Sequence, residues 1–579
     1  MKSMKIVALC AAFVAAAPLQ AQNTGLEFGG SVLNHDMLWA TDLAQLSQTH
    51  VFGTARVMGM GGAFTSLGAD LSSMSLNPAG LGMYRRNEIS LTPLVPMAKA
   101  STAGTASWKG NSKSQFAFAN VGVALNVFES SRSSLTSLTL GIGMNRIADF
   151  NSRYSFSSES RYDPDRPDRQ MPTIADIFSQ QMNNFGVRPD REAEGGGPNG
   201  PVPVDAWNPN VWPAILAYDA YMLGNYGTVK DPIWAVERIG RNASVLHSMD
   251  VVNSGSINEF TISMGGNINN ILYFGASIGI QSVHKKLGVT YQEEYGYFNT
   301  DGIGHDGSGN ALAEQLDVMN LYQEMEMNGS GVNFKLGFTA RPLTGLRVGV
   351  AFHTPTYYSL DRKFQSAAAG LAYANNDTDP NVTPDKDGYI STANDPNMTS
   401  PLLVADGPNG WSFVSPTRLM FGASYTFGER GVISVDYERD WYNGIRIKDN
   451  PSGLDSQSWY NDSFRQNFKA SNIVRVGAEF KPLPVLSLRA GFGYSDSMVR
   501  DDEFPPASPV IKQTTYYGAG VGFVLSRGVL LDLAYQYVSS KLSDYYLFYA
   551  EDKVGYTESA LYSTDINRHN VALTLGFRF

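Results

Sequence analysis

A two-residue alternation of apolar and polar side chains recurs along the chain from Asn87 to its last residue, Phe579. This alternation is the pattern of a β-strand that has two different faces. It is clearest at the end of the chain. There the apolar face holds Val571, Leu573, Leu575, Phe577 and Phe579, and the opposite face holds Asn570, Thr574, Gly576 and Arg578. One face therefore suits lipid and the other suits a polar lumen.

About fourteen such segments are found, an even number as in bacterial membrane barrels. Short connections, such as Pro342 to Thr344 and Ser526 to Arg527, follow even-numbered segments, whereas long ones follow most odd-numbered segments. A membrane barrel with periplasmic turns and extracellular loops produces this alternation, and a soluble sandwich has no reason to. The sequence therefore predicts an all-β fold, a transmembrane antiparallel β-barrel over residues 85–579. The predicted strands are 87–93, 113–127, 135–156, 256–266, 270–286, 330–341, 345–356, 415–427, 431–442, 470–481, 485–496, 512–525, 528–540 and 566–579.

The first residues indicate that the protein is exported. Residues 1–21 have the features of a secretory signal peptide, with Lys2 and Lys5 before a short apolar run and a cleavage site after Ala21. The single cysteine, Cys10, lies within that run, so we expect no disulfide or thiol chemistry in the mature chain. No later stretch approaches the ~18 apolar residues of a transmembrane helix. The net charge of −10 argues against nucleic acid as a partner.

A glycine-rich stretch from Gly53 to Phe64 precedes the strands and continues to Asn77-Pro78-Ala79-Gly80-Leu81-Gly82. Its glycines exclude a stable helix interior and permit close backbone contact. Pro78 directs Asn77 toward an extended or turn conformation, in which the Asn77 amide can bond to the backbone. A compact, irregular segment of small residues suits a confined space. We therefore expect residues 22–84 to form a plug inside the barrel.

These residues resemble a known family. Arg56 to Phe64, Asp70 and the Asn77-Pro78-Ala79-Gly80 element, followed by Tyr84, resemble the FadL/TodX-type outer-membrane transporters for long-chain fatty acids and other hydrophobic compounds. The resemblance implies an N-terminal hatch that plugs a fourteen-stranded barrel in the outer membrane of a Gram-negative bacterium. It also implies passive uptake of hydrophobic small molecules, without catalysis or a cofactor.

Further partners and an alternative follow from the same resemblance. Outer-membrane lipids would surround the barrel, and the barrel-assembly machinery would recognise the last strand through Phe579. The 157–255 loop is longer than typical loops of the family. Relatives on this fold also serve protein-secretion machinery, so the alternative function is an interaction protein that docks a secreted protein or a secretion component.

Two sets of plug residues are candidates for gating. Arg56 and Asp70 would latch the plug to inward-facing charges of the wall, or else the wall charges are solvated and paired with each other. The hatch set would move to open the barrel with its glycines as hinges, or else it forms a static plug. The hatch residues are Gly59, Gly61, Gly62, Asn77, Pro78, Ala79 and Gly80, and the wall charges are Arg475, Glu479, Arg489 and Asp532.

The long connections 157–255, 287–329 and 357–414 are expected on the extracellular side. Helices are predicted at Thr173 to Phe185, around residues 207–223, and at Ala367 to Ala374. Six apolar residues of the first loop could capture a hydrophobic ligand, or else pack the loop onto itself or join an aromatic girdle. They are Trp207, Trp212, Ile215, Leu216, Tyr218 and Met222.

No pattern indicates catalysis or a bound metal. Gly275 to Gly279 match a serine-hydrolase elbow, but Ser277 lies in mid-strand instead of at a strand-to-helix turn. The acidic residues of the 377–388 loop do not complete an EF-hand, and the seven histidines lack zinc-site spacing. We therefore expect no enzyme activity.

Overall fold

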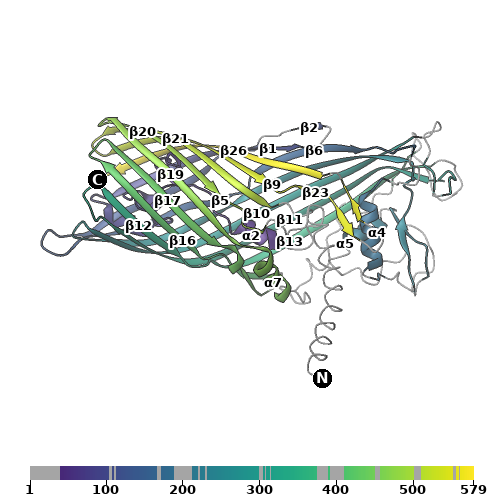
Figure 1. The fold of residues 1–579 in the computed structure, drawn as a ribbon, viewed down its shortest axis with the longest axis horizontal. Helices are drawn as coiled ribbons and strands as arrows, with labels where there is room; N and C mark the ends of the chain where they lie inside the picture. The colour runs from purple at the N-terminus through teal and green to yellow at the C-terminus, as the bar shows by residue number, and fades with distance from the viewer. Residues whose placement is uncertain are drawn as a thin grey trace, which may run out of the picture.

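The computed structural model describes residues 40–103, 107–109, 113–165, 171–184, 186–187, 212–219, 222–228, 231–298, 304–306, 308–312, 314–374, 389–391, 410–449, 457–500, 510–551, 556–559 and 561–579. Its strands form a closed 14-strand antiparallel barrel (Figure 1). The first strand, β1 (Glu88–Ala103), pairs with the last, β26 (Leu561–Arg578), from Glu88 opposite Arg578 to Ala103 opposite Ser563. The predicted all-β antiparallel barrel is confirmed.

Each wall position is filled by one strand or by two consecutive strands separated by a short break. The other wall strands are β4 (Ala117–Glu129), β5 (Leu135–Asp149) with β6 (Ser152–Ser160), β9 (Ala243–Ile268), β10 (Leu272–Tyr297), β11 (Glu314–Ala340), β12 (Leu346–His353) with β13 (Tyr357–Ala374), β15 (Gly410–Val414) with β16 (Arg418–Phe427), β17 (Gly431–Trp441) with β18 (Arg446–Asp449), β19 (Ala470–Leu483), β20 (Leu486–Ser495), β21 (Ile511–Ser526) and β22 (Val529–Leu542). Short strands outside these positions are β2 (Ser107–Lys109), β3 (Lys113–Ser114), β7 (Leu223–Asn225), β8 (Trp234–Val236), β14 (Tyr389–Ser391), β23 (Tyr545–Tyr546), β24 (Tyr549–Glu551) and β25 (Tyr556–Glu558).

The short turns gather at one end of the barrel, as the sequence predicts. Between β9 and β10, Asn269 and Asn270 have φ of 53° and 58°. Two consecutive positive φ values are those of the two-residue hairpin turn that matches strand twist, and asparagine tolerates them better than most residues. Gly428, in the turn between β16 and β17, also has a positive φ of 56°.

The wall is much taller on one side than on the other. Strands β9 and β10 have 26 residues each and β11 has 27, whereas β19 has 14 and β20 has 10. A membrane crossing needs roughly 9–11 residues, so the tall side extends well beyond the lipid.

This extension corrects the predicted bounds of the long loops. Each of the three predicted loops is partly strand. Strand β9 begins at Ala243, within 157–255, and β10 continues to Tyr297 and β11 begins at Glu314, both within 287–329. Strands β13 and β15 lie within 357–414. Beyond the lipid the outward face of these strands is polar. The alternation of apolar and polar residues therefore weakens in the sequence, although the hydrogen bonds between neighbouring strands continue. The helix predicted at Ala367 to Ala374 is wrong for a related reason. This segment belongs to β13 and pairs with β11, and that pairing overrides the helix preference of alanine.

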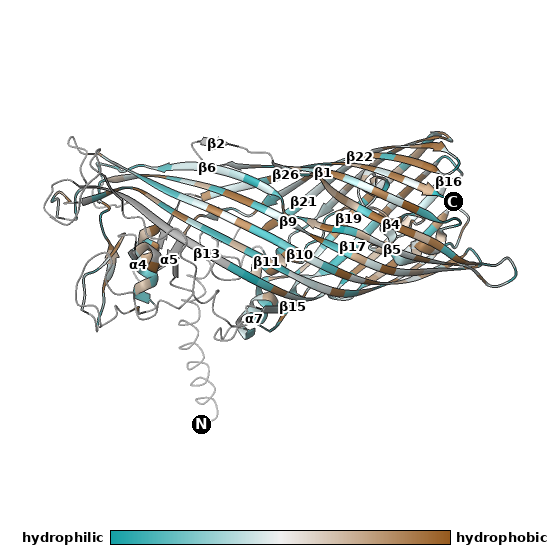
Figure 2. Ribbon diagram, turned by 180° about the vertical axis from the view of Figure 1, so that it is seen from behind, coloured by the Kyte–Doolittle hydropathy of each residue, from teal (hydrophilic) through white to brown (hydrophobic). Residues whose placement is uncertain are grey.

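The outward face carries an apolar band around the short-turn half, visible as brown patches in Figure 2. On β10, the outward residues Ile278 and Ile280 are 44% and 46% exposed, and Ser282 and His284 follow them. Aromatic side chains flank the band, among them Phe427 near the short turns. A closed barrel with such a band spans a membrane, and in bacteria barrels of this kind reside in the outer membrane.

The helices lie inside the barrel and at its loop end. In the lumen are α2 (Ala40–Leu46), α3 (Ala55–Gly59) and the 3₁₀ segments η1 (Leu71–Met74) and η2 (Pro78–Met83). Toward the loops are α4 (Ile174–Asn184), α5 (Trp212–Asp219), η3 (Tyr442–Gly444) and α7 (Gln457–Asn467). No helix in the part of the chain described above is long and apolar enough to cross a membrane.

Candidate functional site

The first half of the lumenal segment folds around capped turns. Thr54 is the N-cap of α3, where its hydroxyl oxygen accepts from the Val57 N–H at 3.4 Å. The same hydroxyl donates to Asp70 Oδ2 at 2.8 Å, and Asp70 Oδ1 accepts from the Ser72 N–H at 2.9 Å. Asp70 therefore connects α3 to η1 within the plug. Among the described residues no ion pair joins Asp70 to a wall charge, so its part in the predicted latch stays a prediction.

Asn77 joins the two halves of the plug. As the N-cap of η2 it accepts from the Ala79 N–H at 3.1 Å, and Pro78 follows at the first helical position, where it needs no donor. The Asn77 Nδ2 donates to the Thr65 carbonyl at 2.6 Å. The Asn-Pro-Ala-Gly element thus holds η2 against the turn that ends the first half.

Glycines of the wall let the plug backbone lie directly against the strands. A Cβ at Gly491 would lie 2.2 Å from Gly61 N, and a Cβ at Gly337 would lie 1.8 Å from Asn77 Oδ1. Real Cβ atoms do not approach so closely, so only glycine fits at these positions. Similar contacts occur on other strands, at Gly275 against Pro78, Gly349 against Thr65, Gly477 against Met60 and Gly518 against Met58. The plug, residues 40–84 in the described part, is therefore seated against strands on many sides of the lumen.

Ion pairs connect the plug to the wall. The Arg56 Nε lies 3.1 Å from Glu479 Oε2, so Arg56 contacts a wall charge as the latch hypothesis expected. Glu479 also pairs with Arg489 at 2.7 Å, and Arg489 pairs with Asp532 at 2.5 Å. These wall charges are mostly paired with one another, and Arg56 adds a plug cation to their network.

A second group of buried charges lies on the inner wall, and only one of its members, Arg475, was named from the sequence. Glu259 is fully buried, forms an ion pair with Lys335 and accepts from the hydroxyl of the plug residue Ser75 at 2.9 Å. Glu438 similarly pairs with Arg418 and, at 2.6 Å, with Arg475. Alternation places Lys335 on the inner face, but nothing in the local pattern identifies a partner 76 residues away.

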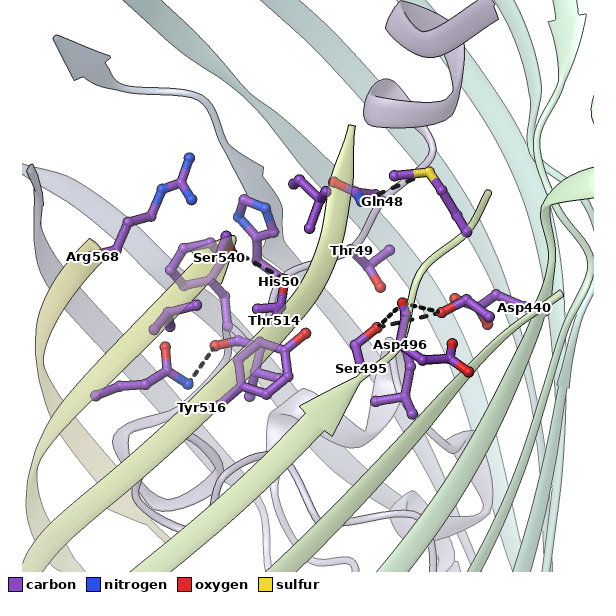
Figure 3. Close-up of a pocket in the computed structure, with 18 of the residues that line it drawn as sticks. Gln48, Thr49, His50, Asp440, Ser495, Asp496, Thr514, Tyr516, Ser540 and Arg568 are labelled. Atoms are coloured by element: carbon purple, nitrogen blue, oxygen red, sulfur yellow. Dashed lines mark hydrogen bonds between the residues drawn. The ribbon is translucent and has the colours of Figure 1, made fainter. Parts of the chain in front are cut away.

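The cavity beside the plug segment 48–52 is lined by polar and apolar side chains (Figure 3). It leaves about 40 Å³ for water-sized molecules. Arg568 lies at one end, Asp440 and Asp496 lie at the other, and His50 and Tyr516 lie between them. This cavity is therefore not purely apolar.

Smaller apolar clusters surround the plug, and the largest lies toward the loops. One continuous buried cluster joins α2, α4 and α5 to the inner faces of β9, β10 and β11. Three of the six predicted capture residues have described side chains, and all three lie in this packing. Ile215 and Met222 are buried, and Tyr218 stacks edge-on against Trp234 at 5.2 Å. Trp207 and the side chains of Trp212 and Leu216 lie outside the described residues.

The burial of Ile215 and Met222 and the packing of Tyr218 fit the alternative in which these residues pack the loop onto itself, and ligand capture stays a prediction. The described side chains of α5 that are buried are Ala214, Ile215 and Ala217, as expected for a helix of mainly apolar residues.

Helix α4 docks onto the tall side of the wall through its N-terminus. The Ile174 N–H donates to Glu293 of β10 at 2.9 Å, and Glu293 is fully buried. A carboxylate at a helix N-terminus complements the unsatisfied N–H groups there. Tyr291 and Tyr295 also donate to Glu293, at 2.7 and 2.6 Å. The predicted helix at Thr173 to Phe185 is confirmed, and the wall residue that anchors it was not foreseen.

We predict that the docking of α4 strengthens as the pH falls from about 6 to about 4. Burial raises the pKa of Asp176, in the first turn of α4, from 3.8 to about 6, and the Glu293 carboxylate adds to the rise. Docking therefore favours the protonated acid, and this contribution is lost as the pH rises through the docked pKa. The effect is at most about 3 kcal/mol, and less to the extent that the half-buried side chain keeps contact with water.

Hydrogen exchange of the α4 amides, corrected for intrinsic rates, measures this effect. Asp176→Asn should give protection that no longer changes across this pH range. Unchanged pH dependence in the variant would assign the effect to another group.

The described residues contain no grouping of three or more histidine, cysteine, aspartate or glutamate side chains that could hold a metal ion.

Ser277 lies within β10, where its hydroxyl donates to the Met74 carbonyl of the plug at 2.9 Å, consistent with the rejection of a hydrolase elbow. The acidic 377–388 loop lies outside the described residues.

No family model and no curated protein matches the sequence. Among solved structures, the fold is similar to a Pseudomonas aeruginosa FadL homologue, with 10% identity and a TM-score of 0.46, over 91% of this chain and 99% of that one. It is also similar to the toluene transporter TbuX of Ralstonia pickettii, with 13% identity and a TM-score of 0.43, over 92% and 99% of the two chains. A third similar structure is the Pseudomonas putida toluene transporter TodX, with 12% identity and a TM-score of 0.42, over 92% and 99%.

Proposed function

We propose that the protein is an outer-membrane channel for the passive uptake of hydrophobic small molecules, such as long-chain fatty acids, through a plugged barrel. The observation that carries the proposal is the apolar inner wall on the loop side of the plug. On β11, four of the five buried inward residues between Met319 and Met327 are apolar, namely Met319, Leu321, Met325 and Met327, and the fifth is Gln323. A water-filled pore would carry polar residues there.

This wall fits a hydrophobic solute for two reasons. Removing apolar surface from water stabilises the bound state by about 25 cal/mol per Å². Methionine side chains are flexible and polarisable, so they can repack around ligands of different shape. The loop segments that now fill the space, α4 and α5, would have to yield to admit the ligand. No chemical step is involved.

The contacts of Asn77 and Arg56 indicate how the channel would open. Asn77 bonds to both halves of the plug, and Arg56 bonds the plug to Glu479. Because many wall glycines touch the plug backbone, moving the whole plug would break all of these contacts together. We therefore infer that opening separates the two halves at Asn77 and leaves part of the plug in place.

Asn77→Ala tests the gate and the transport function together. The lost cap and the lost bond to Thr65 should favour separation by about 1 kcal/mol, which corresponds to about fivefold faster uptake of radiolabelled oleate. The assay uses cells that lack the native gene and carry either form. Asn225→Ala is the matched control, since Asn225 makes similar bonds to the Gly227 and Ile233 N–H groups in the distant β7–β8 hairpin.

Uptake that does not depend on the protein at all would contradict the transport function. In that case the alternative gains weight, namely a barrel that docks a secreted protein or a secretion component. The polar outward surface of β9, β10 and β11 beyond the lipid favours that alternative, because it offers a wide wall outside the membrane. Deleting residues 188–211 should then abolish docking, whereas Asn77→Ala should leave it intact.

A further inference from the structure

A charged cavity lies between the plug and the short-turn end of the wall. It leaves about 330 Å³ for water-sized molecules, enough for a small anion with its hydration. The plug contributes Arg56 and Asp70 to its lining, and the strand ends contribute Glu88, Arg347 and Arg578, among others. We refer to this space as the vestibule. Its place beside the periplasmic turns makes it accessible to periplasmic solutes.

The lining of the vestibule contains four carboxylates and five cations, so the cations exceed the carboxylates by one. The carboxylates are Asp70, Glu88, Glu479 and Asp532, and the cations are Arg56, Arg347, Lys481, Arg489 and Arg578. Arg578 pairs with Glu88 at 2.5 Å, and Arg56, Lys481 and Arg489 all lie within 4.0 Å of Glu479. Among the described residues, Arg347 forms no ion pair.

Arg347 is half-buried on the inner face of β12, and its Nε atom is shielded from water without a hydrogen-bond partner in the described part of the chain. Burial disfavours its charge, Tyr273 acts on the charge favourably, and the arginines Arg341 and Arg56 repel it. A second vestibule atom, the hydroxyl of Ser90, is also buried without a partner. A shielded cation next to other cations is costly unless an anion neutralises it.

We propose that the vestibule binds an oxyanion, a phosphate or a carboxylate group, at Arg347. The guanidinium presents a planar fork of N–H donors that matches two oxygens of such a group, and Arg56 lines the same cavity. Two sources can supply this chemistry from the periplasmic side. One is free phosphate, and the other is the carboxylate head of an amphiphile. The site does not depend on the proposed transport function, since it requires only the vestibule and its unpaired cation.

Isothermal titration of the full mature chain in detergent, at constant ionic strength, tests the proposal. Sodium phosphate and sodium hexanoate are titrated separately, and 1-hexanol serves as the uncharged counterpart of hexanoate. We expect one phosphate or one hexanoate per chain and no 1-hexanol. Binding of hexanoate but not phosphate would identify the amphiphile head as the source, and the reverse would identify free phosphate. Equal binding of hexanoate and 1-hexanol would show that the tail is bound instead and would overturn the proposal.

Two variants locate the site. Arg347→Gln should weaken binding at least tenfold, and Arg347→Lys, which keeps the charge but loses the fork, should weaken it less. Arg430→Gln is the matched control, because Arg430 is an exposed arginine of a neighbouring short turn that does not line the vestibule. Undiminished binding in Arg347→Gln, or equal loss in Arg430→Gln, would overturn the proposal. Unchanged circular dichroism and thermal unfolding would show that each variant is folded.

Discussion

Replacing Gly491 with alanine should unseat the plug and make the barrel leak. The new Cβ would lie 2.2 Å from both Gly61 N and Met60 C. Both atoms belong to the backbone of the plug, and Gly491 itself lies in the hydrogen-bonded strand β20, so neither side yields as a flexible side chain would. Overpacking of this kind costs about 1–3 kcal/mol. The strain would be relieved by displacing the turn at Gly61 from the wall.

The measurement is the ion conductance of the purified protein in a planar lipid bilayer. The wild type should be nearly silent, and Gly491→Ala should give open-channel events. Gly518→Ala, on the neighbouring strand, should have the same effect, because its Cβ would lie 2.5 Å from the Met58 carbonyl oxygen. Gly288→Ala is the control, since the nearest atom there is 4.0 Å away. Silent channels in both Gly491→Ala and Gly518→Ala would refute the idea that these contacts seat the plug.

The second large effect is expected at Glu259. Glu259→Leu removes the partner of Lys335, whose side chain is 4% exposed, and leaves a buried ammonium without a countercharge. Breaking a buried ion pair from one side costs about 3–5 kcal/mol. The bonds that Glu259 accepts from Ser75, Gln281 and Asn333 are also lost, so plug and wall are both affected.

A double-mutant cycle separates the charge from the other bonds. Lys335→Met on the Glu259→Leu background should restore at least half of the lost free energy of unfolding, because no uncompensated charge remains. Urea unfolding in detergent micelles, followed by tryptophan fluorescence, measures all four proteins. Additive losses in the double variant would show that the two groups do not interact. The network around Glu259 would then owe its stability to the neutral hydrogen bonds.

The wall could be predicted closely from the sequence, because its signal is local. Period-two alternation located the last strand at 566–579, and the structure places β26 at Leu561–Arg578. The plug segment was recognisable for a similar reason. Its glycines and the Asn77-Pro78 pair predicted a compact, irregular backbone, and the structure places Gly61 and Gly62 at positive φ and Asn77 at an N-cap. The expectation that the glycines exclude a helix is wrong for Ala55–Gly59, which form the short helix α3 under the Thr54 cap. Where the lipid ends, the outward face becomes polar and the local signal weakens, so the tall ends of β9, β10 and β11 were taken for loops.

The sequence by itself determined which residues face lipid, which face the lumen and where the backbone must be compact. Only the tertiary structure decided which lumenal charges meet. Arg56 and Glu479 are 423 residues apart, and the pairing depends on how the barrel closes and on the depth at which the plug sits. The same holds for Glu293, which anchors α4, and for Arg347, which has no partner in the described part of the chain. Strand alternation shows which face of the sheet a charged residue occupies. It carries no information about the residues on the opposite side of the lumen, so the sequence pattern is the same whether the partner of a charge is near, distant or absent.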